Sequence, residues 1–322
     1  MVPARTMKAD PVVIALAMLV ATAGCDRGAQ QQADQAEAAA RAAAEQAFAT
    51  KQRQWREERV AGLTRADGWT SLVGLHWITP GPHFVGSSPG SGIRLAAGPD
   101  ELGLLTLERD GGLRLVPASG AQLTLDDAPL DGPAALASDA DQAGPSRIGF
   151  DEGKGVATVI KRGERYALRV RHAEAPTRSG FAGLDYWPAS RDWMLQARFV
   201  AHPPGRTIRI ANIIGTIDET PNPGAVEFTR QGKPYRLEAL DGGDGSLFLV
   251  FADRTNGRGS YGAGRFLDAP APDAQGRVEL DFNRSYNPPC AFTAFATCPL
   301  PPPQNRLDLA IDAGEKAYAG RH

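Results

Sequence analysis

The sequence contains few cysteines, no long hydrophobic run and no excess of positive charge. Only 3 of its 322 residues are cysteine, which excludes a small scaffold held together by several disulfides. The longest apolar run, residues 11–20, has about half of the roughly 20 residues that a membrane-spanning helix needs. The formal net charge is −2, so we expect no nucleic-acid partner, because such partners are bound by basic surfaces.

The apolar run belongs to a segment that resembles a bacterial lipoprotein signal peptide. Arg5 and Lys8 precede the run, and small residues lead directly to Cys25. The resemblance implies that residues 1–24 are removed and that acylated Cys25 anchors the protein to a lipid membrane. The alternative is ordinary signal cleavage, with Cys25 incidental. Asp26 resembles an inner-membrane retention signal, so we expect a lipid-anchored protein of the bacterial cell envelope, on the periplasmic side of the inner membrane rather than in the outer membrane.

The next segment is rich in alanine, glutamine and glutamate, which are good helix formers. Glu37 and Arg41 are four residues apart, with the acid first, as in a stabilised helix. We interpret residues 25–48 as a partly helical spacer and residues 49–66 as a helix that leads into the globular body. Plain disorder of the spacer is the alternative.

From Gly68 onward, short apolar or alternating runs are separated by Gly, Pro, Asp and Asn. This pattern is typical of sandwiches and barrels and not of alternating strands and helices. We therefore predict an all-β fold with two closely packed sandwich-like or barrel-like halves, residues 67–175 and 176–322. Residues 83–171 also faintly resemble the forkhead-associated fold, but they lack that family's phosphopeptide-binding residues.

One predicted hairpin carries a row of arginines. Side chains alternate along a strand, so Tyr166 and Leu168 share one face while Arg165, Arg169 and Arg171 share the other. Such a row can bind anions. The alternative interpretation is a solvated outer face of the sheet.

A cluster of polar side chains follows the last clear strand and ends at two prolines, which fix the direction of the chain. Rigid segments at strand ends often hold functional side chains. The candidate ligand-binding residues are Arg265, Asp281, Asn283, Arg284, Tyr286 and Asn287. The secondary candidates are Tyr261, Asp253, Glu315 and His76. The alternative is a structural cluster whose members satisfy one another.

Cys290 and Cys298 are eight residues apart in a proline-rich segment. Outside the cytoplasm, such a pair most simply forms a disulfide; a metal or redox role and free thiols are the alternatives. The histidines show no paired ligand spacing, so we expect no metal site and no cofactor. The chain has no Gly-x-Ser-x-Gly motif.

Five segments together closely resemble the bacterial domain-of-unknown-function family 1684. They are Gly68–Trp77, Tyr261–Leu267, Asp281–Phe292, Cys298–Leu307 and Ala313–Lys316. The resemblance covers about residues 52–318 and implies no settled activity. We expect an envelope lipoprotein whose β body binds a small polar or anionic ligand, and whether it is an enzyme stays open. The alternatives are a non-catalytic interaction or structural protein of the envelope and a thiol-disulfide protein that uses Cys290 and Cys298.

Overall fold

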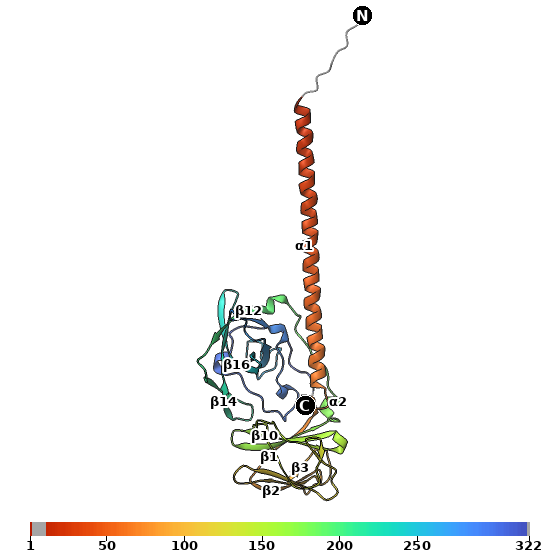
Figure 1. Ribbon diagram of the computed structural model, residues 1–322, viewed down its shortest axis with the longest axis vertical. Helices are drawn as coiled ribbons and strands as arrows, with labels where there is room; N and C mark the ends of the chain where they lie inside the picture. The colour runs from red at the N-terminus through yellow and green to blue at the C-terminus, as the bar shows by residue number, and fades with distance from the viewer. Residues whose placement is uncertain (2–10, 321–322) are drawn as a thin grey trace. The chain divides into compact units, whose positions relative to one another are not determined.

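The computed structural model describes residue 1 and residues 11–320, with the backbone alone for residues 11–29. The chain divides into two compact units, residues 1–54 and 55–322. One helix, α1 (Pro11–Leu63), runs through the first unit and ends in the second (Figure 1). The predicted N-terminal helix is thereby confirmed. The side chain of Cys25 lies outside the described residues, as do Arg5 and Lys8. In the described part of the chain, no helix has both the length and the apolarity needed to cross a membrane.

The end of α1 is fixed by a close approach of the chain to its last turn. A Cβ atom at Gly68 would lie 2.4 Å from the carbonyl oxygen of Leu63, so only glycine fits there. The Thr70 hydroxyl donates a hydrogen bond of 2.7 Å to the same carbonyl. These contacts place the short helix η1 (Trp69–Ser71) beside the end of α1.

The first β half consists of two sheets that share one apolar core. The six-stranded sheet has the order β1-β11-β10-β9-β6-β7, and the five-stranded sheet has the order β3-β2-β4-β5-β8. All pairs are antiparallel except β2 with β3. The strands are β1 (Leu72–Ile78), β2 (Gly81–Gly86), β3 (Ile93–Arg94), β4 (Gly103–Leu107), β5 (Leu113–Pro117), β6 (Thr124–Leu125), β7 (Ala128–Pro129), β8 (Ala134–Ala135), β9 (Arg147–Phe150), β10 (Gly155–Arg162) and β11 (Arg165–His172). Buried leucines and isoleucines from both sheets form the core.

The predicted alternation along β11 is present, but its polar face is not a solvated surface. Leu168 and Val170 point into the core of the first half. On the opposite face Ala167 is fully buried and Arg169 is nearly so. Thr297 of the second half lies within hydrogen-bond distance of Arg169. The interpretation as a solvated outer face is therefore wrong for Arg169, because the second half covers this part of the sheet.

The second β half is built around a six-stranded sheet of order β18-β17-β16-β15-β12-β19, with a separate pair β13-β14. Its strands are β12 (Met194–Ala201), β13 (Thr207–Ala211), β14 (Ile217–Pro221), β15 (Gly224–Arg230), β16 (Lys233–Gly243), β17 (Ser246–Phe251), β18 (Arg265–Ala269) and β19 (Arg277–Asp281). Phe282 lies at the centre of its core and contacts the rings of Trp193, Phe228 and Phe251. One of the chain's sheets forms a half-barrel, and the predicted mostly β fold is confirmed.

Short helical turns connect the strands and support the polar segment. They are η2 (Asp151–Gly153), α2 (Pro176–Ser179), η3 (Arg191–Trp193), η4 (Phe282–Arg284), η5 (Pro289–Ala291) and η6 (Pro303–Asn305). The apolar run at residues 307–311 has a strand-like pattern but forms no strand. Its backbone instead pairs with the chain beyond β17: Leu307 donates to the Ala252 carbonyl, and Arg254 donates to the Leu309 carbonyl.

Candidate functional site

Arg265 begins β18 and is fully buried, with 0% of its surface exposed. One terminal nitrogen, Nη2, donates to Asp253 Oδ2 at 2.6 Å and to the carbonyl of Ile311 at 2.8 Å, while Nη1 donates to the carbonyl of Ala313. Asp253 in turn accepts from the backbone N–H of Ile311. The predicted role of Arg265 in lining a ligand pocket is wrong, because its acceptors are protein groups that fasten the C-terminal segment to the sheet.

Asp281, Asn283 and Arg284 form a clasp at the end of β19. The Asn283 amide donates to the carbonyl of Ser190 at 2.8 Å, and its oxygen accepts from the Ser190 N–H at 2.9 Å. The same amide donates to Asp281 Oδ1 at 2.8 Å. Arg284 Nε lies 3.2 Å from Asp281 Oδ2, and 38% of the Arg284 side chain is exposed. This cluster therefore joins two segments of the chain, and only Arg284 presents a substantial surface to solvent.

Glu315 and Asn287 form a second buried cluster with Arg59 from the last turns of α1. Glu315 is 0% exposed; it accepts from Arg59 Nε at 2.7 Å and from the backbone N–H of Asn287 at 2.7 Å. Arg59 Nη2 donates to the Asn287 carbonyl, and the Asn287 amide donates to the Lys316 carbonyl. Burial raises the pKa of Glu315, and the positive charge of Arg59 opposes that rise. Glu315 and Asn287 thus position Arg59.

Tyr286 is the predicted site residue that lines an open pocket. The pocket has a volume of about 390 Å³, and five aromatic rings and three charged side chains contribute to it. Its lining residues are Trp55, Glu58, Arg59, Trp69, Phe248, Phe266, Asp268, Tyr286 and Pro289. We call it the aromatic pocket. The Tyr286 hydroxyl donates to Asp268 Oδ2 at 3.0 Å, and the Arg59 guanidinium lies 4.6 Å from the centre of the Tyr286 ring.

The electrostatics of the aromatic pocket are set by Asp268. Asp268 is exposed, yet partial burial of its carboxyl raises its pKa, while the Tyr286 hydroxyl and the Arg59 charge act against the rise. Burial also raises the pKa of Tyr286, and the neighbouring Asp268 charge adds to this effect. Tyr286 therefore remains a neutral donor beside a carboxylate that can accept further hydrogen bonds.

The six candidate residues are thus not gathered around one cavity. Tyr286 lines the aromatic pocket, Arg284 is half-exposed in the clasp, and Arg265 is enclosed. Arg59 and Asp268 were not among the candidates predicted from the sequence. Two signals pointed to them: Trp55 and Arg59 are four residues apart on one helix, and Asp268 directly follows the segment Tyr261–Leu267.

The other predicted residues, Tyr261, His76 and the two cysteines, do not line the aromatic pocket. Tyr261 donates to the carbonyl of Cys290 at 3.2 Å. His76 lies on β1, where burial lowers its pKa, and its Nε2 has no hydrogen-bond partner among residues 11–320. Cys290 and Cys298 form the predicted disulfide, with their Cα atoms 6.2 Å apart. Among the described residues, no group of three or more His, Cys, Asp or Glu side chains is arranged to hold a metal ion.

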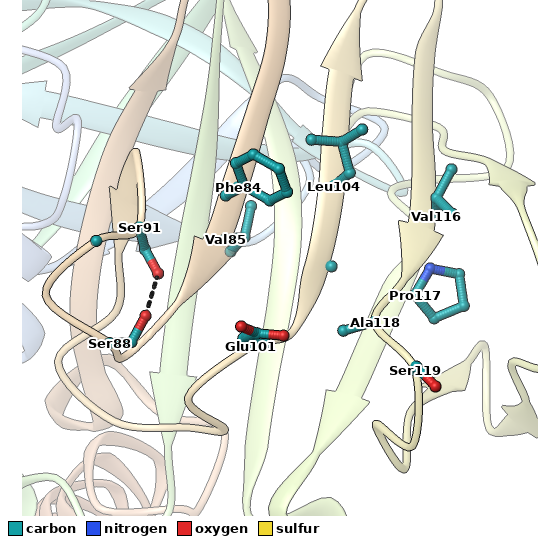
Figure 2. A pocket seen from close by; sticks show the side chains of 12 residues that line it. Phe84, Val85, Ser88, Ser91, Glu101, Leu104, Val116, Pro117, Ala118 and Ser119 are labelled. Carbon is teal, nitrogen blue, oxygen red and sulfur yellow. Dashed lines mark hydrogen bonds between the residues drawn. The ribbon is translucent and has the colours of Figure 1, made fainter.

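A second pocket, of about 450 Å³, lies on the five-stranded sheet of the first half (Figure 2). Phe84 on β2, Leu104 on β4 and Val116 on β5 stand side by side on its floor, and Phe84 is 70% exposed. Glu101 is the one charged side chain among its lining residues. The pocket thus combines these apolar side chains with one carboxylate and three serines, Ser88, Ser91 and Ser119.

The molecule is thus an all-β body with an aromatic-lined pocket beside its N-terminal helix. The model of a family described as "Protein of unknown function (DUF1684)" matches residues 179–316, which supports the resemblance to that family over the second β half. The Gly68–Trp77 segment lies outside the matched residues. The solution structure of an uncharacterised protein from Haloarcula marismortui is 29% identical; the match covers 43% of this chain and 78% of that chain, with a TM-score of 0.36. Among curated proteins, none matches this chain.

Proposed function

We propose that the protein is a lipid-anchored protein of the bacterial envelope whose β body binds a small polar ligand in the aromatic pocket. The observation that carries this proposal is the pairing of Tyr286 with Asp268 inside a pocket walled by aromatic rings. Ligand sites in proteins combine an apolar wall with a few converging polar groups and with carboxyls of shifted pKa. The proposal concerns binding, and it assigns no reaction.

The polar groups of the aromatic pocket favour a ligand that donates hydrogen bonds. Asp268 and Glu58 are carboxylates, and both contribute to the lining. Arg59 is the cation of the pocket, but its charge is already compensated by buried Glu315, and its guanidinium is held against the Tyr286 ring. A hydroxylated or amine-bearing ligand with a flat apolar face therefore fits better than a simple anion, because rings stack on such a face while carboxylates accept from its donors.

Tryptophan fluorescence tests the binding proposal directly, because Trp55 and Trp69 line the pocket. The purified full chain is titrated with a panel of monosaccharides, polyols, amino acids and diamines. We expect at least one class to shift the emission saturably in the wild type, and Asp268→Asn to weaken that binding at least tenfold. Tyr261→Phe is the control, since Tyr261 is not one of the lining residues and its hydroxyl bonds to a backbone carbonyl. A flat response to the whole panel contradicts the proposal.

The membrane anchor rests on the sequence around Cys25. Several acyl chains on one cysteine hold a protein on a bilayer stably, whereas a single chain does so only marginally. Metabolic labelling with a palmitate analogue should mark the wild type and Cys298→Ser, and should leave Cys25→Ser unlabelled. An unlabelled wild type contradicts the anchor and leaves the ligand pocket untouched. Because of Asp26 we also expect the anchored protein to stay in the inner membrane. Separating the two membranes by density tests this.

A further inference from the structure

Three arginines gather where the six-stranded sheet of the first half meets the second half. Arg162 ends β10, and Arg169 and Arg171 lie on β11. Arg169 and Arg171 are two residues apart on one strand, so their side chains leave the same face of the sheet about 7 Å apart. Thr297, next to the disulfide, faces them from the second half. We call Arg169 and Arg171 the arginine pair.

Arg162 and Arg169 differ in the hydrogen-bond acceptors that surround them. Arg162 donates to the Thr297 hydroxyl at 2.9 Å and to Asp139 at 2.8 Å, so it has a carboxylate of its own. Arg169 is only 7% exposed, and its one hydrogen bond is a long contact of 3.4 Å to the same hydroxyl. Its Nε is buried and has no hydrogen-bond partner in the part of the chain that the structure describes. The arginine that is buried most deeply at this junction thus has the weakest acceptor.

Arg171 is no better satisfied. Its Nε is buried without a partner, and its side chain makes no hydrogen bond to any residue that the structure describes. The acid whose charge acts on it is Asp67, whose two oxygens accept from Arg65 at 3.0 and 3.1 Å. The guanidiniums of the arginine pair lie 5.7 and 5.6 Å from the centre of the Trp69 ring. An aromatic face attracts a cation, but by much less than a carboxylate in contact.

The charges around the arginine pair do not balance. Arg162, Arg169 and Arg171, with Arg147, which acts on Arg171, carry four positive charges against the two of Asp139 and Asp67. Burial and repulsion from Arg162 and Arg171 lower the pKa of Arg169 to about 10. Buried charges in proteins are normally paired, because an unpaired one loses its hydration without compensation. A missing negative charge is the simplest completion of this cluster.

We propose that Arg169 and Arg171, beside Trp69, form a binding site for a small oxyanion, with inorganic phosphate as the reference ligand. A guanidinium presents a planar fork of donors that matches two oxygens of a phosphate or carboxylate. Two such forks on one strand face hold one tetrahedral oxyanion from two sides. The Thr297 hydroxyl adds a third group that approaches from the second half. This site takes a different ligand from the aromatic pocket, with which it shares Trp69.

Phosphate-dependent thermal unfolding of the full chain tests the proposal, with ionic strength held constant by sodium chloride. A ligand that binds only the folded state stabilises it by RT ln(1 + c/Kd), where c is the free ligand concentration, so the unfolding temperature keeps rising with the logarithm of c above Kd. We expect this logarithmic rise for the wild type, and a phosphate dissociation constant fitted from it that is at least tenfold higher for Arg169→Gln. Arg171→Gln, a change at a less buried position, gives the same reading if Arg169→Gln fails to fold.

Arg165→Gln is the matched control, because Arg165 belongs to the same face of β11 but is exposed, with its guanidinium 3.9 Å from the Trp77 ring. It should keep the wild-type dissociation constant. In phosphate-free buffer, Arg169→Met should unfold at the same or a higher temperature than the wild type, since it removes an unpaired buried charge. The proposal is overturned if phosphate acts no more strongly than chloride, if Arg165→Gln weakens binding equally, or if Arg169→Met lowers the unfolding temperature without phosphate.

Discussion

Arg265 in the second β half and Arg169 in the first are both buried, yet the protein surrounds them differently. The two terminal nitrogens of Arg265 bond to a carboxylate, Asp253, and to two backbone carbonyls, although its Nε, like that of Arg169, is buried without a partner among the described residues. Arg169 has a distant hydroxyl and an aromatic ring. Equal burial of the same residue type therefore does not mean an equal role. The number of protein acceptors separates an arginine that completes the fold from one that can still take a ligand.

The same contrast applies to the carboxylates. Glu315 is enclosed and receives donors from Arg59 and from the Asn287 backbone. Asp268 receives one donor from the protein, Tyr286, and keeps contact with solvent in the aromatic pocket. The polar segment after β19 therefore contains both kinds of group: side chains used up by the structure and side chains with unused capacity for hydrogen bonds.

The largest loss of stability is expected when Arg265, the arginine with a carboxylate partner, is replaced. Arg265→Met leaves Asp253 buried without its cation, and removing one partner of a buried pair costs about 3–5 kcal/mol. Urea unfolding of the full chain measures the change. Arg277→Met is the control, because Arg277 and Asp273 form an exposed pair, and such pairs contribute about 0–1 kcal/mol. Equal losses for the two variants would contradict the assignment of Arg265 as a structural residue.

The second effect concerns the disulfide beside the arginine pair. Replacing Cys290 and Cys298 by serine opens a short ring, for which the chain-entropy model gives a loss of about 2.5 kcal/mol. It also loosens Thr297, which is adjacent to Cys298 and contacts Arg169. Urea unfolding with and without a reductant checks this: the reductant should destabilise the wild type and leave the double variant unchanged. A variant as stable as the wild type would show that the ring contributes nothing.

Much of the architecture was accessible from the sequence because it depends on local pattern. The alternation along β11 identified which side chains face the core, and the spacing of Cys290 and Cys298 identified the disulfide. Tyr286 was recognised because it lies in a polar segment at a strand end. Each of these features is determined by residues that are close together in the chain.

The hydrogen-bond acceptors of each polar group could not be predicted from the sequence, because they come from distant segments of the chain. Arg265 is satisfied by the carbonyls of Ile311 and Ala313, which are some 46 and 48 residues away. The aromatic pocket takes Arg59 from α1 and Asp268 from β18. A solvated face remained an alternative for the arginine row because the sequence does not say which sheet face the second half covers.

The smallest expected effect distinguishes the two kinds of carboxylate by the sign of their pH dependence. The raised pKa of Asp268 means that the folded protein holds this proton more tightly than the unfolded chain does. Its contribution to stability is therefore present below the unfolded pKa, near 3.9, and is lost as pH rises through the folded pKa. Because the carboxyl is partly exposed, we expect a difference below about 1 kcal/mol between Asp268→Asn and the wild type.

Asp308→Asn is the control variant. Hydrogen bonds from Lys233 and Arg254 lower the pKa of Asp308, so the contribution of this carboxylate to stability is lost as pH falls. Unfolding free energies from pH 3 to 7 should therefore show opposite slopes for the two variants relative to the wild type, and parallel slopes would contradict the desolvation of Asp268.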